Sequence, residues 1–280
     1  MAAILGTNVA SLWASKNLQS AQTNMANSVE RLSSGLRINR ARDDSAGLGI
    51  ANALTQQING AEMGIRNLSD GISIVQTAEG ALAQVTEMAQ RILSLSIQGT
   101  NSALTVSQKE SLTTEMNTLL TGINNIQTRT KFGSTQLLNN ATITVYSSNV
   151  STDSVSISAA ALTTVSTGGS ALTVSTTVAA ATASTSVANF QNISSATVTY
   201  ITSLDTQRGI LGAVQNQMEY SINNITELSA NLTAARSRVV DTDYASETAV
   251  LTKGQILQQA ATAMLAQANQ MPNVILSLLK

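Results

Sequence analysis

Residues 51–82 read ANALTQQINGAEMGIRNLSDGISIVQTAEGAL, and most of their large apolar side chains fall on two tracks. One track steps by seven residues through Leu54, Ala61, Leu68, Val75 and Leu82, and the other through Ala51, Ile58, Ile65 and Ile72. Two seven-residue tracks are typical of a helix that packs along another helix. The pattern therefore predicts one long helix, from about residue 44 to residue 98, that needs a helical partner.

Similar spacing recurs toward both ends of the chain. Near the N-terminus the tracks are Leu18, Met25 and Leu32, and Gln22, Val29 and Leu36. Near the C-terminus, heptads run through 204–239 and then through Val250, Leu257, Met264 and Met271, with the small residues Gly254, Ala261 and Ala268 predicted to face the partner helix. A shorter helix is predicted around 112–126, and Pro272 is expected to end the last helix. Such narrow apolar seams need helices from this chain or from a copy of it.

The middle of the chain has a different pattern, in which apolar residues alternate with Ser and Thr. Ile143 and Val145, and later Val155 and Ile157, show the period of two that is typical of strands. A near-repeat at 161–167 and 171–177 flanks a Gly-Gly pair, as two hairpin strands would, although a low-complexity segment is the alternative.

The chain is therefore predicted to be mainly α. We expect a long antiparallel coiled-coil helical bundle formed by both chain ends, with a small insert that contains β-hairpins or strands. The expected domains are an inner terminal-helix domain (1–42 with 241–280), an outer helical rod (43–140 with 200–240) and a variable insert (141–199). The residues expected to mediate helix or subunit assembly are Leu18, Met25, Val29, Leu32, Leu257, Met264, Leu276 and Leu279.

Composition excludes several kinds of chemistry. The 280 residues include no Cys and no His, so thiolate or imidazole metal sites, disulfides and Ser-His-Asp triads cannot form. We expect no catalytic residue, metal or cofactor. The formal net charge of -1 gives no electrostatic basis for binding nucleic acid or an anionic membrane. The first residues lack a basic leader, so we expect no cleaved signal peptide.

The few charges gather where the helical pattern breaks. Arg37, Arg40, Arg42, Asp43 and Asp44 form one cluster. A second cluster near the other end contains Arg236, Arg238, Asp241, Asp243 and Glu247. We expect the two clusters to meet and to fix subunit register through ion pairs, with two solvated linkers as the alternative.

Several motifs resemble those of bacterial flagellin. They are RLSSGLRIN at 31–39, DDSAGLGIA at 43–51 and NLSDGISIVQTAEGA at 67–81, together with SRVVDTDYA at 237–245, QILQQA at 255–260, LAQANQ at 265–270 and LSLL at 276–279. The resemblance covers roughly 1–140 and 200–280. It implies a structural subunit that polymerises into the flagellar filament, with terminal helices in an inner tube, longer helices around it and a variable insert outside.

The resemblance also implies partners and a location outside the cell. It implies type III export without cleavage, an export chaperone at the C-terminal helices, addition beneath a filament cap, and contact with hook-junction proteins. Toll-like receptor 5 recognises this family, and the matching positions are Arg91, Leu95 and Glu115, although Leu93 and Ser94 replace the charged pair that usually precedes the leucine. A hook-filament junction protein and a chemoreceptor-type signalling rod are the alternative functions.

Overall fold

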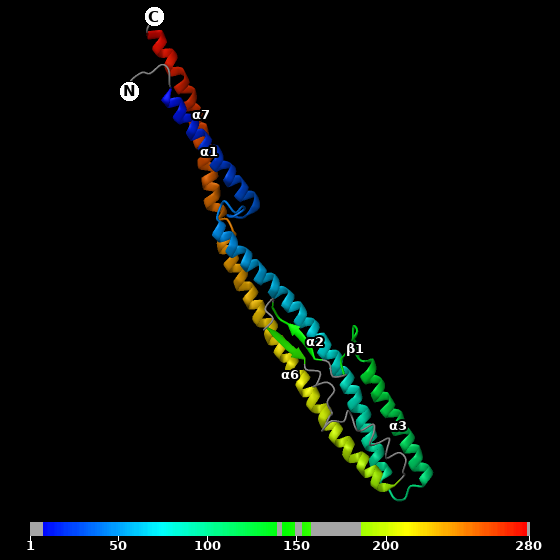
Figure 1. Cartoon of the computed structure of the whole chain (residues 1–280). Helices are drawn as coiled ribbons and strands as arrows, with labels where there is room; N and C mark the ends of the chain where they lie inside the picture. The colour runs from blue at the N-terminus through cyan, green and yellow to red at the C-terminus, as the bar shows by residue number, and fades with distance from the viewer. Residues whose placement is uncertain (1–7, 139–141, 149–152, 158–185, 279–280) are drawn as a thin grey trace. The chain divides into compact units, whose positions relative to one another are not determined.

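The structure is a computed structural model that describes residues 8–138, 142–148, 153–157 and 186–278, with side chains only up to residue 270 at the C-terminal end. Its helices are α1 (Val9–Ser34), α2 (Ser45–Gly99), α3 (Val106–Arg129), α6 (Val187–Val240) and α7 (Tyr244–Leu278). Two antiparallel hairpins join β1 (Lys131–Phe132) to β2 (Thr135–Gln136) and β3 (Ile143–Tyr146) to β4 (Ser154–Ile157) (Figure 1). The predicted mainly α fold is confirmed.

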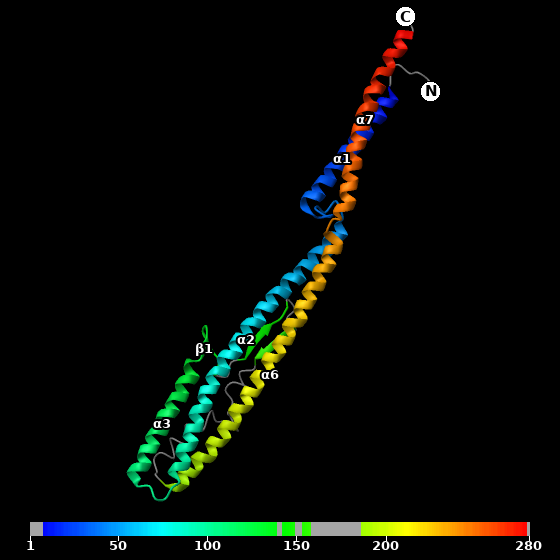
Figure 2. The same ribbon diagram turned by 180° about the vertical axis from the view of Figure 1, so that it is seen from behind.

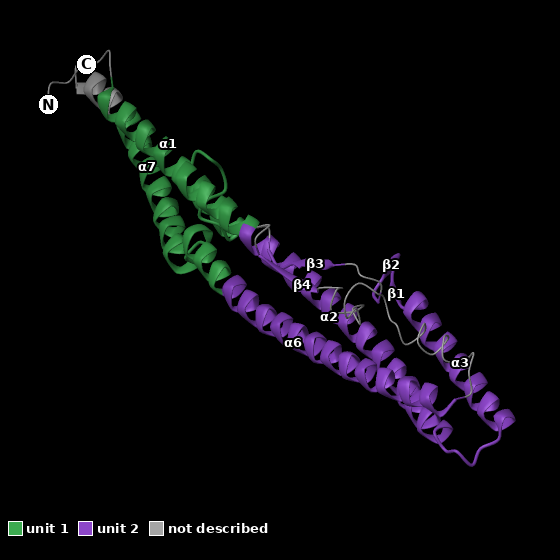
Figure 3. Ribbon diagram, turned by 60° about the horizontal axis from the view of Figure 1, so that its bottom comes forward, with its two compact units in different colours: residues 1–56, 231–280 green, residues 57–230 purple. Residues whose placement is uncertain are grey.

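The chain divides into two compact units (Figure 3). Unit 1 contains residues 1–56 and 231–280, and unit 2 contains residues 57–230. Unit 1 therefore combines the two ends of the chain, whereas unit 2 is one continuous segment. The three-part domain division expected from the sequence stays a prediction.

Unit 2 contains the larger core, built where α2 lies between α3 and α6 (Figures 1 and 2). Leu68, Val75 and Leu82 from the predicted heptad track are at most 3% exposed. Met116 and Ile123 of α3 and the α6 residues Leu204, Leu211 and Met218 complete this core. The predicted seams of these three helices are confirmed, except that Leu228 of α6 is half exposed.

The hairpin of β3 and β4 packs on α2 in a register that pairs Val145 with Val155 and Ile143 with Ile157. It approaches α2 so closely that a Cβ atom on Gly64 would lie 1.9 Å from the backbone oxygen of Ser147. Only glycine leaves room for this contact. Val145, Val155 and Ile157 are all buried, which confirms the strands predicted at these positions. The near-repeat at 161–177 lies outside the described residues.

Two boundaries differ from the sequence-based expectation. Residues 187–199 are helical rather than extended, because Phe190, Ile193 and Thr197 continue the 3-4 spacing of the α6 core face. The abundance of β-branched residues concealed that period. The prediction that Pro272 ends the last helix is also wrong, since α7 continues to Leu278.

The helix surfaces are rich in Ser and Thr whose hydroxyl groups bond to their own helix. Ser73, Thr77 and Thr206, for example, each donate to the carbonyl oxygen four residues earlier, at distances of 2.8–3.1 Å. This back-bonding satisfies hydroxyl groups that would otherwise require water or a partner.

Candidate assembly interface

The terminal helices α1 and α7 pack against each other through small side chains. On α1 the most buried positions are Ala14, Ala21 and Ser28. On α7, Gly254 and Ala268 are buried and Ala261 is half-buried, as the sequence predicted. A Cβ atom on Gly254 would lie 3.6 Å from the Cβ of Met25, so the two backbones approach closely. Small residues make this separation possible.

The second track predicted for α1 does not face α7. Gln22 and Val29 lie exposed, whereas Ala14, Ala21 and Ser28 occupy the facing positions. Leu18, Met25 and Leu32 of the first track are half-buried in the seam. The sequence analysis favoured large apolar residues, and it therefore missed an interface made by alanine and serine.

Asn8 ties the start of α1 to α7. Its side-chain oxygen accepts a hydrogen bond from the Ser11 backbone N–H at 3.1 Å, which caps α1. Its amide nitrogen donates to the carbonyl oxygen of Ala268 at 2.7 Å. In a regular helix the N–H of residue 272 would bond to that carbonyl, but Pro272 has no N–H. Asn8 thus satisfies the acceptor that Pro272 leaves open.

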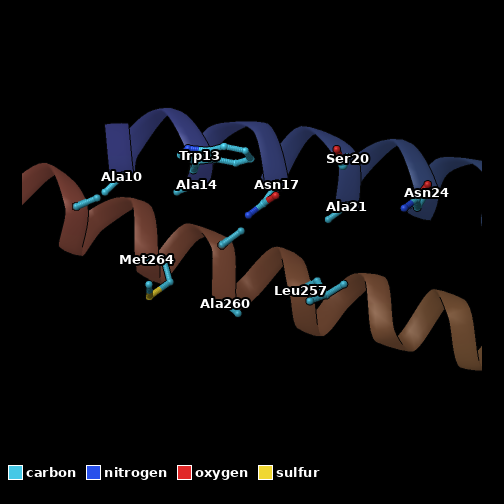
Figure 4. A pocket seen from close by; sticks show the side chains of 12 residues that line it. Ala10, Trp13, Ala14, Asn17, Ser20, Ala21, Asn24, Leu257, Ala260 and Met264 are labelled. Carbon is cyan, nitrogen blue, oxygen red and sulfur yellow. The ribbon is translucent and has the colours of Figure 1, made fainter. Parts of the chain in front are cut away.

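A groove of about 590 Å³ runs between α1 and α7, as Figure 4 shows from close by. Its lining includes Trp13, Ala14 and Ala21 from α1 and Leu257, Ala261 and Met264 from α7. The larger of these residues remain accessible, because Trp13 is 59% and Met264 is 66% exposed. Val9, Leu12, Val250 and Ile256 are further exposed apolar residues on the same two helices.

The groove is also nearly free of charge. Lys16, whose ammonium group lies 5.4 Å from the centre of the Trp13 ring, is the only charged residue between Asn8 and Val29. Lys253 is the only one between Val250 and Gln270. An exposed apolar surface with so little charge is typical of a surface that another protein covers.

Backbone hydrogen bonds connect the segment that follows α1 with the segment between α6 and α7. The Arg37 N–H donates to the Val240 carbonyl at 2.6 Å, and the Thr242 N–H donates to the Gly35 carbonyl at 3.0 Å. The Arg37 guanidinium also donates to the Val239 carbonyl at 2.7 Å. A cation is favoured at this place because the C-terminus of α6 carries partial negative charge. Arg37 therefore contacts the end of α6 beside the second charge cluster through carbonyl groups and not through an ion pair.

The acidic members of the clusters mostly serve their own segments. Asp243 accepts from the Ala245 N–H and so caps α7, and Asp44 accepts from the Gly47 N–H near the start of α2. Asp241 accepts from the Ser237 hydroxyl group at 2.6 Å. Glu247 pairs with Arg31, which was not part of the predicted cluster, at 3.6 Å. Ion pairs between copies of the chain stay a prediction.

Asp43 is held in a tight turn with the neighbouring arginines. Desolvation raises the pKa of its carboxyl group, but hydrogen bonds from the Arg40 and Asn39 N–H groups, together with the charge of Arg42, hold that pKa below its ordinary value of 3.8. Arg42 lies 3.5 Å from Asp43, and Arg40 pairs with Glu30 at 2.8 Å. Arg236 is half-buried and Arg238 is exposed.

The three residues expected to contact an immune receptor differ in their surroundings. The Nε and Nη2 atoms of Arg91 both donate to Glu115 Oε1, at 2.9 and 2.7 Å, on the surface of unit 2. Leu95 is only 1% exposed and belongs to the core. Leu95 therefore cannot form an outward contact in this fold, because its side chain fills the space between packed helices.

The described part of the chain contains neither a candidate membrane-spanning helix nor a candidate metal site. Within those residues, no helix is long and apolar enough to cross a membrane. Nor do three or more acidic side chains come together there as a metal site would require. The side chain of Leu276 and the whole of Leu279 lie outside the description.

Fold and groove together define a helical structural protein built from its two chain ends. A family model for the bacterial flagellin N-terminal helical region matches residues 5–142, and one for the C-terminal helical region matches residues 195–279. Flagellin from Halalkalibacterium halodurans is 38% identical over 99% of this chain and all of its own length. Flagellin from Bacillus subtilis is also 38% identical, over 98% of both chains.

A more distant sequence relative also belongs to this family. Flagellin B from Vibrio anguillarum is 32% identical over the full length of both chains. The crystal structure of Bacillus cereus flagellin is similar at a TM-score of 0.47 and 22% identity, covering 61% of this chain and 94% of that one. The chain belongs to the bacterial flagellin family on the strength of the sequence matches, and it is a structural subunit of the flagellar filament.

Proposed function

We propose that this chain polymerises with identical copies and that neighbouring copies cover the groove between α1 and α7. The observation that carries the proposal is that α1 and α7 contact each other through small residues and leave their largest apolar side chains exposed. Small residues hold α1 to α7, while Trp13, Leu257 and Met264 remain exposed. A pair that leaves its largest apolar side chains in water gains stability when another copy buries them.

The same reasoning gives the terminal pair a conditional stability. Two helices that pack through alanine, glycine and serine bury little apolar surface. The free energy gained from this burial offsets only a small part of the conformational entropy lost when the two helices become ordered. We infer that α1 and α7 become fully ordered only on polymerisation. Residues 1–42 with 241–280 then act as the inner assembly domain, and Val29, Leu276 and Leu279 add to its contacts.

The remaining partners follow from family membership. We infer export without a cleaved signal peptide, an export chaperone that covers α7 before assembly, and addition of subunits between a filament cap and hook-junction proteins. Receptor recognition would involve Arg91 and Glu115, which are exposed and paired with each other. The two charge clusters would set subunit register through ion pairs between neighbouring copies.

The tryptophan provides the test, because Trp13 is the only one in the chain and lines the groove. Polymerisation of purified protein is expected to shift its emission to shorter wavelengths as a neighbour excludes water. Leu257→Gln should raise the critical concentration at least about fivefold, since about 1 kcal/mol of apolar burial is lost. Thr252→Gln, on an exposed position of α7 outside the groove, is the matched control.

Two results would contradict the proposal. One is a filament in which Trp13 keeps the emission of the monomer. The other is normal assembly of the Leu257→Gln variant at unchanged critical concentration. Circular dichroism of both variants before assembly would show whether either change had altered the helix content of the monomer.

A further inference from the structure

The methionines whose side chains the structure describes differ widely in exposure, with Met25 and Met88 half-buried between the extremes. Met116 and Met218 are fully buried in the core of unit 2. Met264 on α7 is 66% exposed and Met63 on α2 is 51% exposed. The thioether of an exposed methionine is open to oxidants, whereas a buried one is shielded by its neighbours. Of these two exposed thioethers, only that of Met264 lines the groove.

We propose that Met264 is an oxidation site through which peroxides control assembly of this chain. This inference rests on the proposed function, because it requires that a second copy cover the groove. The oxidant is a hydroperoxide such as hydrogen peroxide. A lone pair on the methionine sulfur attacks one peroxide oxygen, and the O–O bond breaks. The sulfur loses two electrons and becomes a sulfoxide, while the second oxygen leaves as hydroxide and is protonated to water.

Oxidation changes the side chain at the point where assembly requires an apolar one. The sulfoxide adds a strong dipole and an acceptor oxygen to a wall that Ala261, Leu257 and Trp13 also form. Covering that oxygen without a donor costs free energy, which raises the critical concentration by about tenfold. A sulfoxide in the exposed monomer remains hydrated and costs little. Oxidation therefore disfavours the polymer over the free subunit.

The position also makes the response one-sided. In the free subunit the thioether is accessible, so a peroxide reaches it before assembly. Once a neighbouring copy covers the groove, the same sulfur is shielded as Met116 and Met218 are in unit 2. We expect peroxide to stop the growth of new polymer while existing polymer stays reduced at Met264.

Two matched variants separate this site from the rest of the chain. Among the methionines whose side chains are described, Met63→Leu leaves Met264 as the exposed thioether, and Met264→Leu leaves Met63. Every other methionine is common to both proteins, so its oxidation affects them equally. Both monomers are treated with hydrogen peroxide, the oxidised positions are mapped by peptide mass spectrometry, and polymer formation is followed by sedimentation and by Trp13 emission.

Each oxidised variant is compared with the same variant before treatment. We expect oxidation to raise the critical concentration of Met63→Leu about tenfold and to leave that of Met264→Leu unchanged. The inference is overturned if both oxidised variants assemble as well as the untreated proteins, or if both fail equally. It is also overturned if Met264 in preformed polymer oxidises as fast as in the monomer. Failure of the untreated proteins to polymerise would instead refute the proposed function, so the two outcomes are distinguishable.

Discussion

Replacement of Gly64 by alanine tests the close contact between α2 and the β3–β4 hairpin. The added methyl carbon would lie 1.9 Å from the Ser147 backbone oxygen and 2.5 Å from its carbonyl carbon. Both atoms belong to the backbone, so no side-chain rotation relieves the overlap. The hairpin must move away from α2, which loosens the packing of Val145, Val155 and Ile157.

The expected cost follows from this packing. Full burial of each of the three side chains is worth about 1.5–3 kcal/mol, and a partial shift of the hairpin loses a fraction of that sum. Alanine in place of glycine returns about 1 kcal/mol through helix propensity. We therefore expect Gly64→Ala to lower the free energy of unfolding of unit 2 by about 2–4 kcal/mol. For a unit of this size, that corresponds to a melting temperature lower by about 4–16 °C.

Gly80 provides the matched control on the same helix. No atom lies within 4 Å of the place where its Cβ would be. Gly80→Ala should therefore raise stability by up to about 1 kcal/mol. Thermal unfolding followed by circular dichroism gives the order of the three proteins, and hydrogen exchange should show lost protection in β3 and β4 for Gly64→Ala alone. If Gly64→Ala were as stable as Gly80→Ala, the hairpin would not pack on α2 as described.

Three further predictions concern single side chains. Burial raises the pKa of the Tyr200 hydroxyl group, and a hydrogen bond with the side chain of Gln127 opposes this shift to a smaller extent. Alkaline titration followed at 295 nm should therefore show that one of the four tyrosines ionises only when the protein unfolds. Because that pKa is raised in the folded state, its contribution to stability is complete below pH 10 and is lost as pH rises further, and Tyr200→Phe should abolish this dependence in alkaline melts. Asn8→Ala should destabilise the terminal pair by about 1–2 kcal/mol. The effect should be smaller in a Pro272→Ala background, because residue 272 then has an N–H that can donate to the Ala268 carbonyl. Both effects are measured by helix content in polymer, and equal effects in the two backgrounds would contradict the link between Asn8 and Pro272. Arg37→Met should increase hydrogen exchange at residues 239–242, whereas Arg37→Lys should retain part of the protection because it keeps the charge near the α6 terminus.

The sequence predicted the long helices well, because their seams repeat over many turns. Leu68, Val75 and Leu82 were placed correctly in the core of unit 2, and the strand pair around Val145 and Val155 followed from alternation. The start of α6 was missed because Ser, Thr, Val and Ile fill seven of the 13 positions 187–199 and continue the composition of the insert, which concealed the spacing of Phe190 and Ile193. Local propensity is a weak guide where tertiary packing decides.

The site was harder to predict than the fold. Leu257 and Met264 were predicted to mediate assembly, and both line the groove, but their exposure depends on which face of α7 is covered by α1. Gly254 was predicted to face a partner helix, whereas Ala14 and Ala21 of α1 were missed because their small side chains carry a weak hydrophobic signal. The link from Asn8 to Ala268 spans 260 residues and could not be read from local pattern. Because Pro272 was expected to end the last helix, nothing in the sequence indicated that the Ala268 carbonyl inside α7 needs a distant donor.

The self-bonded hydroxyl groups of the helices have a consequence for the conditions under which copies associate. A surface whose Ser and Thr protons are already engaged releases little bound water when a neighbour approaches, and only 11% of the chain carries charge. Away from the two charge clusters, electrostatic attraction and repulsion between copies then depend only slightly on dissolved electrolyte. Such a coat allows subunits to pack densely in dilute and in saline surroundings alike.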